Sequence, residues 1–183
     1  MLRTASLIAF VLLAAAGCKS KKSDGGAAAS GGAAPSGNDW SKVPLETVEL
    51  SADGVTYSIS VPKGLPKSGG DPKSWSNDKP EHDQDPKVFT SLGSNVTTLD
   101  SALSDAMFDA EKVAKLARKE ERPTGYAFTD VAGDKHRVEA RTLTRAGDKM
   151  IKCTATQVTE GALPSFEATK AMLEKICDSV KPK

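Results

Sequence analysis

The sequence predicts an α+β domain in which amphipathic helices pack on an antiparallel β-sheet, in the order β-β-β-α-β-β-β-α. Three observations predict it. Apolar residues alternate with polar ones in six short stretches, as they do in strands. In two longer stretches they recur about every 3.6 residues, as they do in helices. The part that carries these patterns, residues 40–183, has the usual size of one domain with one hydrophobic core.

The first two strands are expected to form a hairpin. Val48 and Leu50 alternate with polar residues before the pair Asp53-Gly54, and a second alternating stretch follows that pair. An Asp-Gly pair between two such stretches favours a tight turn. Pro62 then ends the second strand, because proline has no amide hydrogen to donate.

A long surface loop is expected at residues 63–86. This stretch consists largely of Gly, Pro, Asp, Ser and Lys and has little periodicity. Loops of this length in compact domains are usually either functional or disordered, so function would be sought here. A third strand follows at residues 87–92, "KVFTSL".

A helix is expected from Leu99 to Ala117. Its apolar residues fall on one face, Thr98 or Asp100 can serve as its N-cap, and the charged stretch "RKEER" lies at its end. Pro123 stops it, because proline cannot continue a helix.

Three strands and a second helix complete the domain. The strands are "YAFTDV", "KHRVEARTLTR" and "KMIKCTATQV", divided by two copies of "AGDK" at 132–135 and 146–149. Both copies are expected to be turns in which glycine supplies a positive φ. The second helix begins at about Ser165 as N-cap and is expected to bury Phe166, Met172, Leu173, Ile176 and Val180.

Two short phrases resemble PsbP-like domains, which are found outside the cytoplasm and include small bacterial lipoproteins. They are "SISVPKGLP" at the end of the hairpin and "KICDSVKP" at the end of the last helix. Together with the order of elements, the resemblance covers residues 45–181. It implies an α/β/α sandwich and a role in binding or assembly, and it brings no catalytic motif.

Residues 1–17 have the pattern of an export signal. Arg3 is followed by an uncharged, mostly apolar run that is too short to span a membrane. The run ends in "AAAGC", which resembles the lipobox of bacterial lipoproteins, so Cys18 is expected to be lipidated and to begin the mature chain. Ala15 occupies the position where leucine is most common. The alternative is an ordinary signal cut after Ala16, with Cys18 incidental.

Residues 18–39 are expected to be a flexible tether. They are almost all Lys, Ser, Gly, Ala, Asp and Pro, which cannot bury enough apolar surface to order the chain. A lipidated Cys18 would hold the domain near a membrane outside the cytoplasm. Lys19, rather than aspartate, follows it, which by the sorting rule of enteric bacteria favours the outer membrane.

The charge balance excludes one class of partner. The chain has 25 basic and 24 acidic residues and becomes neutral once Arg3 leaves with the signal. It therefore lacks the basic footprint of a protein that binds nucleic acid.

With Cys18 lipidated, Cys153 and Cys177 are left for a disulfide between the last strand and the last helix. Disulfides persist outside the cytoplasm, which favours this pairing. Two unpaired buried thiols are the alternative. A structural zinc site is less favoured, because neither cysteine has a second ligand at C-x-x-C spacing.

Two classes of function remain. The sequence carries no catalytic, phosphate-binding or cofactor motif, so we expect a non-catalytic module that binds another envelope protein or a small ligand, without cofactor or metal. The alternative is an envelope enzyme with a cryptic hydrolytic or metal-dependent site near His82, which lies among Asp78, Glu81, Asp83 and Asp85.

Trp75, in the long loop, is the best single candidate for a residue that contacts a ligand or partner. An exposed aromatic ring is a common anchor in binding. The alternative is that the ring folds back on the edge of the sheet, since tryptophan is usually mostly buried. The other histidine, His136, is expected to be an exposed or half-exposed strand residue.

Overall fold

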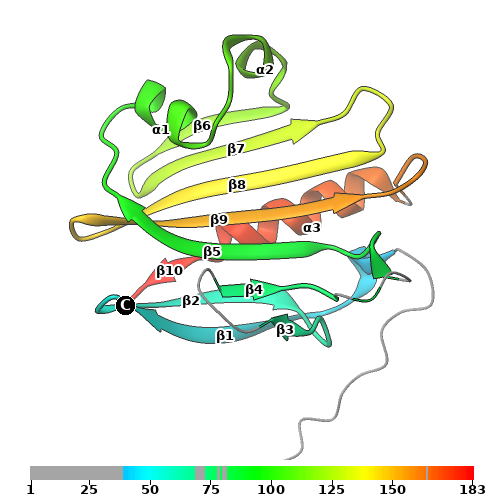
Figure 1. Cartoon of the computed structure of the whole chain (residues 1–183), viewed down its shortest axis with the longest axis horizontal. Coiled ribbons are helices and arrows are strands. Elements are labelled where there is room, and N and C mark those ends of the chain that lie inside the picture. The colour runs from blue at the N-terminus through cyan, green and yellow to red at the C-terminus, as the bar shows by residue number, and fades with distance from the viewer. Residues whose placement is uncertain (1–38, 69–72, 78, 80–81, 164) are drawn as a thin grey trace, which may run out of the picture. The chain divides into compact units, whose positions relative to one another are not determined.

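The strands form two antiparallel sheets, shown in Figure 1 in a computed structural model that describes residues 39–68, 73–77, 79, 82–163 and 165–183. The large sheet has the order β3-β4-β5-β9-β8-β7-β6 and the small sheet the order β1-β2-β10. The strands are β1 (Leu45–Ala52), β2 (Val55–Pro62), β3 (Lys67–Ser68), β4 (Lys73–Trp75), β5 (Lys87–Ser94), β6 (Arg118–Arg122), β7 (Gly125–Val131), β8 (Arg137–Ala146), β9 (Lys149–Val158) and β10 (Lys181–Pro182). The helices are the 3-10 turn η1 (Trp40–Lys42), α1 (Leu99–Asp105), α2 (Ala110–Lys115) and α3 (Phe166–Asp178).

The predicted combination of antiparallel strands and a few helices is confirmed, and so is the opening hairpin. Ala52 pairs with Val55 across a two-residue turn. Asp53 has a φ of 45° and Gly54 a φ of 79°, and a tight hairpin turn requires this left-handed conformation at both positions. Asp and Gly are the residues that adopt it most readily.

The strands β7, β8 and β9 form where the sequence predicts them, but the two "AGDK" turns differ. Gly147 in the second copy has the expected positive φ, of 65°. In the first copy the left-handed residue is Lys135, with a φ of 61°, rather than the glycine. The expectation of one turn used twice is therefore wrong.

The prediction of a strandless loop at 63–86 is also wrong. The short strands β3 and β4 lie there and extend the large sheet, with Trp75 of β4 paired to Val88 of β5. A strand of three residues is too short for its alternation to be recognised in the sequence.

A continuous helix from Leu99 to Ala117 does not form. Thr98 caps α1 as expected, because its hydroxyl accepts a hydrogen bond from the amide of Ser101. The helix ends at Asp105, however, and α2 is a separate piece of six residues. The stretch "RKEER" is the edge strand β6 and not the end of a helix.

The last helix begins at its predicted position without the predicted cap. Ser165 immediately precedes α3, but its φ is 48° and, within the described chain, its side chain makes no capping hydrogen bond. Its hydroxyl lies 3.3 Å from a carboxylate oxygen of Asp39, so it contacts the start of the described chain instead.

The large sheet separates two hydrophobic cores, because alternate residues of each strand point to opposite faces. On one face α3 packs against β8 and β9 and also contacts β2 of the small sheet (Figure 1). Ile151 and Leu173 belong to this main core, together with Tyr57. On the other face α1 and α2 cover a smaller core that contains Phe128 and Met150.

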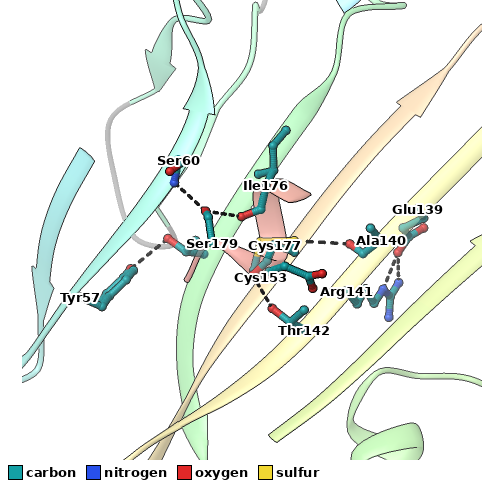
Figure 2. Close-up of a disulfide and its surroundings, with 12 residues drawn as sticks. Tyr57, Ser60, Glu139, Ala140, Arg141, Thr142, Cys153, Ile176, Cys177 and Ser179 are labelled. Carbon is teal, nitrogen blue, oxygen red and sulfur yellow. Dashed lines mark hydrogen bonds and ion pairs between the residues drawn. A yellow bond between two sulfur atoms is a disulfide. The ribbon is translucent and has the colours of Figure 1, made fainter. Parts of the chain in front are cut away.

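A disulfide between Cys153 and Cys177 joins β9 to α3 through the main core (Figure 2). Both residues are buried, and their Cα atoms are 5.4 Å apart. The predicted pairing is therefore present, and the alternative of two free thiols is wrong.

Residues 1–38, with the predicted signal, Cys18 and most of the tether, lie outside the described residues. The lipid anchor and the tether accordingly stay predictions. None of the helices in the described ranges is long and apolar enough to cross a membrane.

Candidate binding pocket

A pocket of about 300 Å³ lies between the end of α1 and the large sheet. Small-molecule sites in proteins begin at about this volume. The pocket opens over the face of the sheet that α1 and α2 only partly cover, and its side chains from β5 and β9 are half-buried. Its principal lining residues are Phe89 and Ser91 of β5, Lys152 and Thr154 of β9, Arg141 of β8, and Asp105 and Met107 at the end of α1.

Met107 ends α1 in an uncommon conformation. Its φ is 56°, in the left-handed region that glycine favours. Its amide donates to the carbonyl of Ser104, and the amide of Phe108 donates to the carbonyl of Leu103, which is the Schellman pattern of a helix end. The side chain of Met107 is 79% exposed. The chain therefore presents a large apolar side chain to solvent at the rim of the pocket.

Arg141 fixes the end of α1 to the sheet. Its Nη1 donates to the carbonyl oxygen of Ala106, the C-cap residue of α1. Its Nε donates to Glu139 (Figure 2). Its guanidinium carbon lies 4.9 Å from the centroid of the Phe108 ring. A cation is favourable at a helix C-terminus, where carbonyls lack partners in the helix. These contacts hold the guanidinium in one place at the wall of the pocket.

Lys152 is held by one ion pair. Its ammonium lies 2.7 Å from Oδ1 of Asp105. Its stem crosses over Gly93, where an added Cβ would lie only 2.1 Å from Cε of Lys152. A larger residue at position 93 would therefore displace the end of this lysine from its present position.

The pocket lining combines cations, a carboxylate and hydroxyls. Arg141 and Lys152 supply cations, Asp105 supplies one carboxylate, and Ser91 and Thr154 supply hydroxyls. Among the described residues, its lining includes no histidine that could serve as a general base. The arrangement can hold a polar or anionic ligand against an apolar rim.

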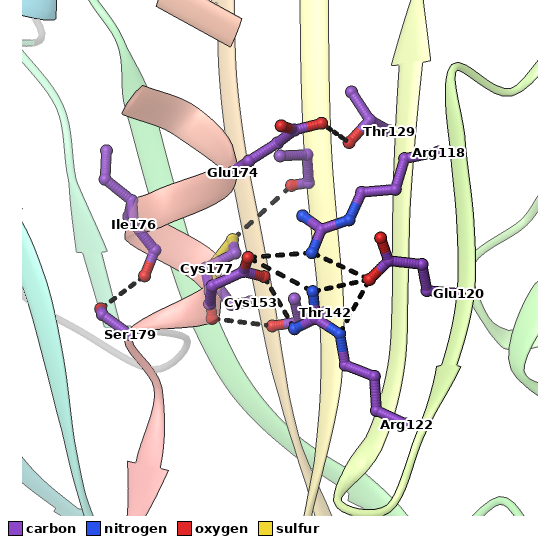
Figure 3. A network of polar contacts seen from close by, with 12 residues as sticks. Arg118, Glu120, Arg122, Thr129, Thr142, Cys153, Glu174, Ile176, Cys177 and Ser179 are labelled. Atoms are coloured by element: carbon purple, nitrogen blue, oxygen red, sulfur yellow. Dashed lines mark hydrogen bonds and ion pairs between the residues drawn. A yellow bond between two sulfur atoms is a disulfide. The ribbon is translucent and has the colours of Figure 1, made fainter. Parts of the chain in front are cut away.

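A second polar cluster lies on the opposite face, between β6 and α3 (Figure 3). Arg118 and Arg122 both contact Asp178, at 2.9 and 3.0 Å, and both contact Glu120, at 3.1 and 2.8 Å. Burial raises the pKa of Asp178 above its ordinary value, against the opposing charge of Arg118. The cluster ties the edge strand to the end of the helix, so its charges are engaged with each other.

Glu174 belongs to the same face. Burial acts to raise the pKa of Glu174, but hydrogen bonds from Lys170 and Thr129 outweigh it and hold that pKa below its ordinary value. The carboxylate therefore stabilises the fold in its ionised form.

The structure contradicts the expectation that Trp75 is exposed. Only 2% of the residue is accessible to solvent, because its side chain packs in the main core. The alternative, that the ring folds back on the sheet, is what occurs. A buried indole cannot anchor a partner, so Trp75 holds the short strand β4 in place.

His82 also serves the fold. Its Nδ1 lies 2.9 Å from one carboxylate oxygen of the buried Asp85, and the other oxygen accepts a hydrogen bond from the indole of Trp40 at 2.9 Å. Asp78 and Glu81 lie outside the described residues. Within the described ranges, no three His, Cys, Asp or Glu side chains gather as metal ligands do.

The pocket residues were missed because nothing in their sequence marks them. Arg141 and Lys152 occupy ordinary polar positions of alternating strands. Met107 falls on the apolar face of the predicted helix, so the pattern predicts its burial. The one available signal is the glycine in "SLGS", since Gly93 inside a strand indicates a close approach of another group.

The chain is similar in structure to the Ran-binding protein Mog1p of Saccharomyces cerevisiae. The TM-score is 0.49 and the identity 14%, and the similarity covers 76% of this chain and 96% of that one. A likeness of this degree transfers no function. No protein-family model and no curated protein sequence matches the chain.

Proposed function

We propose that this chain is a lipid-anchored, non-catalytic binding module of the bacterial cell envelope, and that the pocket beside α1 is its binding site. One observation carries the proposal: Arg141 and Lys152 are held in fixed positions at a pocket whose rim exposes Met107. Side chains that are fixed before a ligand arrives lose little freedom on binding, which favours affinity.

The anchoring part of the proposal rests on the sequence. The lipobox-like "AAAGC" before Cys18, the polar tether and the resemblance to PsbP-like domains all favour an exported lipoprotein. The disulfide between Cys153 and Cys177 supports export, because such bonds persist outside the cytoplasm. The sorting rule favours the outer membrane.

Photo-crosslinking in intact cells tests the binding site. A photoreactive residue at Thr154, in the pocket, should trap a ligand or partner in the envelope when the full chain is expressed. The matched control carries the same residue at Glu46, which is exposed on β1. Adducts at 154 and not at 46 would support the proposal. Equal labelling at both positions, or none at 154, would contradict it.

A further inference from the structure

We propose that the pocket beside α1 binds a carboxylate joined to a short apolar group. The carboxylate would lie between Lys152 and Arg141, and the apolar group would pack against Phe89 and Met107. This inference rests on the proposed function and names the class of ligand for the same site. A free carboxylic acid and the carboxyl end of a peptide share this chemistry.

The ion pairs at the pocket favour an anion with one charge over an anion with two. Arg141 and Lys152 each contribute one positive charge, and their partners Glu139 and Asp105 each contribute one negative charge. Glu139 lies outside the lining but neutralises Arg141. Because these four charges balance, they offset less of the large desolvation cost of an anion with two charges.

Arg141 and Lys152 both have N–H groups left that can donate to the carboxylate of the ligand. An arginine has five N–H groups, and the contacts of Arg141 with the described residues engage three of them, on Glu139 and the carbonyl of Ala106. A lysine has three, and Lys152 directs one to Asp105. Charge-assisted hydrogen bonds of this kind are about twice as strong as neutral ones.

The apolar group of the proposed ligand is inferred from Met107. A left-handed conformation at a residue that is not glycine is uncommon, and such strain gathers at ligand sites. Here the left-handed backbone keeps the thioether side chain of Met107 in solvent. The half-buried Phe89 lines the same pocket. A short apolar group on the ligand would cover both side chains and remove their apolar surface from water.

A titration of the full mature chain with small probes tests the assignment. We expect hexanoate to bind at least tenfold more tightly than hexanamide, which has the same shape without the charge. N-acetyl-Ala-Leu with a free carboxyl end and with an amidated end gives the matched pair for a peptide source. The acid that binds more tightly identifies the source.

Two variants link binding to the pocket. Lys152→Met keeps a long stem over Gly93 but removes the charge, so it should weaken acid binding at least tenfold. Lys149→Met, on the same strand outside the pocket lining, should leave it unchanged. Far-ultraviolet circular dichroism checks that both variants fold.

Four results would overturn the assignment: equal binding of acid and amide, full affinity in Lys152→Met, equal loss in both variants, or tighter binding of inorganic phosphate than of either acid. If neither acid binds while the photoreactive residue at Thr154 still traps a partner, the ligand class is wrong and the binding function stands. If the acids bind as expected but position 154 traps nothing in the envelope, the ligand class stands and the proposed function loses its support.

Discussion

Replacing Met107 with glycine should make the protein more stable and its pocket weaker. The side chain is 79% exposed, so it adds little packing to the fold. The backbone, with a φ of 56°, is in a region that glycine enters without steric conflict. Stability therefore favours glycine at position 107, whereas binding favours methionine.

The size of the gain follows from two opposing terms. A left-handed conformation costs a non-glycine residue about 1 to 2 kcal/mol. Glycine loses more freedom on folding, which costs about 0.5 to 1 kcal/mol. The net stabilisation by Met107→Gly lies between about 0 and 1.5 kcal/mol. Its midpoint of about 0.75 kcal/mol raises the Tm of a domain of this size by about 1.5 to 3 °C.

Met107→Ala is the matched control. Alanine also lacks the long side chain, but it has the same conflict in the left-handed region as methionine. Calorimetry should therefore show a raised Tm for Met107→Gly alone, while titration with hexanoate should show weaker binding in both variants. A Tm of Met107→Gly at or below that of Met107→Ala would refute the claim that the helix end is strained.

Four further outcomes are expected. Trp75→Ala should destabilise the domain by about 3 to 5 kcal/mol in urea unfolding, because the buried indole leaves a cavity; an unchanged midpoint would mean that the ring is not in the core. Replacing both Cys153 and Cys177 with alanine should cost about 3.5 kcal/mol by the chain-entropy model for a separation of 24 residues, seen as a lower urea midpoint. Glu174→Gln should flatten the fall in Tm on acidification. The lowered pKa of Glu174 gives stability that is present above 4.5, its ordinary value, and is lost as the pH falls below it, so parallel curves for the two proteins would contradict this. Cys18→Ala should lose acylation and leave the detergent phase, and a variant that stayed membrane-bound with unchanged mass would disprove the lipid anchor.

The hairpin and the strands β7, β8 and β9 could be predicted because their signals are local. The turn at Asp53-Gly54 and the alternation on either side of it depend only on neighbouring residues. The disulfide could also be predicted, by counting the cysteines left after Cys18.

The pocket could not be predicted, because it arises from a contact between distant segments. Arg141 donates to the carbonyl of Ala106 at the C-cap of α1, 35 residues earlier, and Lys152 pairs with Asp105, 47 residues earlier. In the sequence, both residues have the pattern of ordinary polar strand residues. They line a pocket because the end of α1 lies over them. The position of this helix end depends on the interruption of the helix at Met107. The helical periodicity of residues 99–117 does not predict that interruption.

The strand β6 shows how tertiary contacts override local preference. The stretch "RKEER" consists of good helix formers, which is why the sequence predicts a helix end there. In a strand, however, Arg118, Glu120 and Arg122 all point to the face where Asp178 lies. A helix would keep Arg118 and Arg122 on one face, four residues apart, but it would turn Glu120, which contacts both of them, away from that face. The alternate residues of the same strand, Lys119 and Glu121, put charges on its other face, and charged edge strands resist pairing with a second chain. One charged stretch therefore fastens the sheet to α3 and protects its edge, and both effects require the strand.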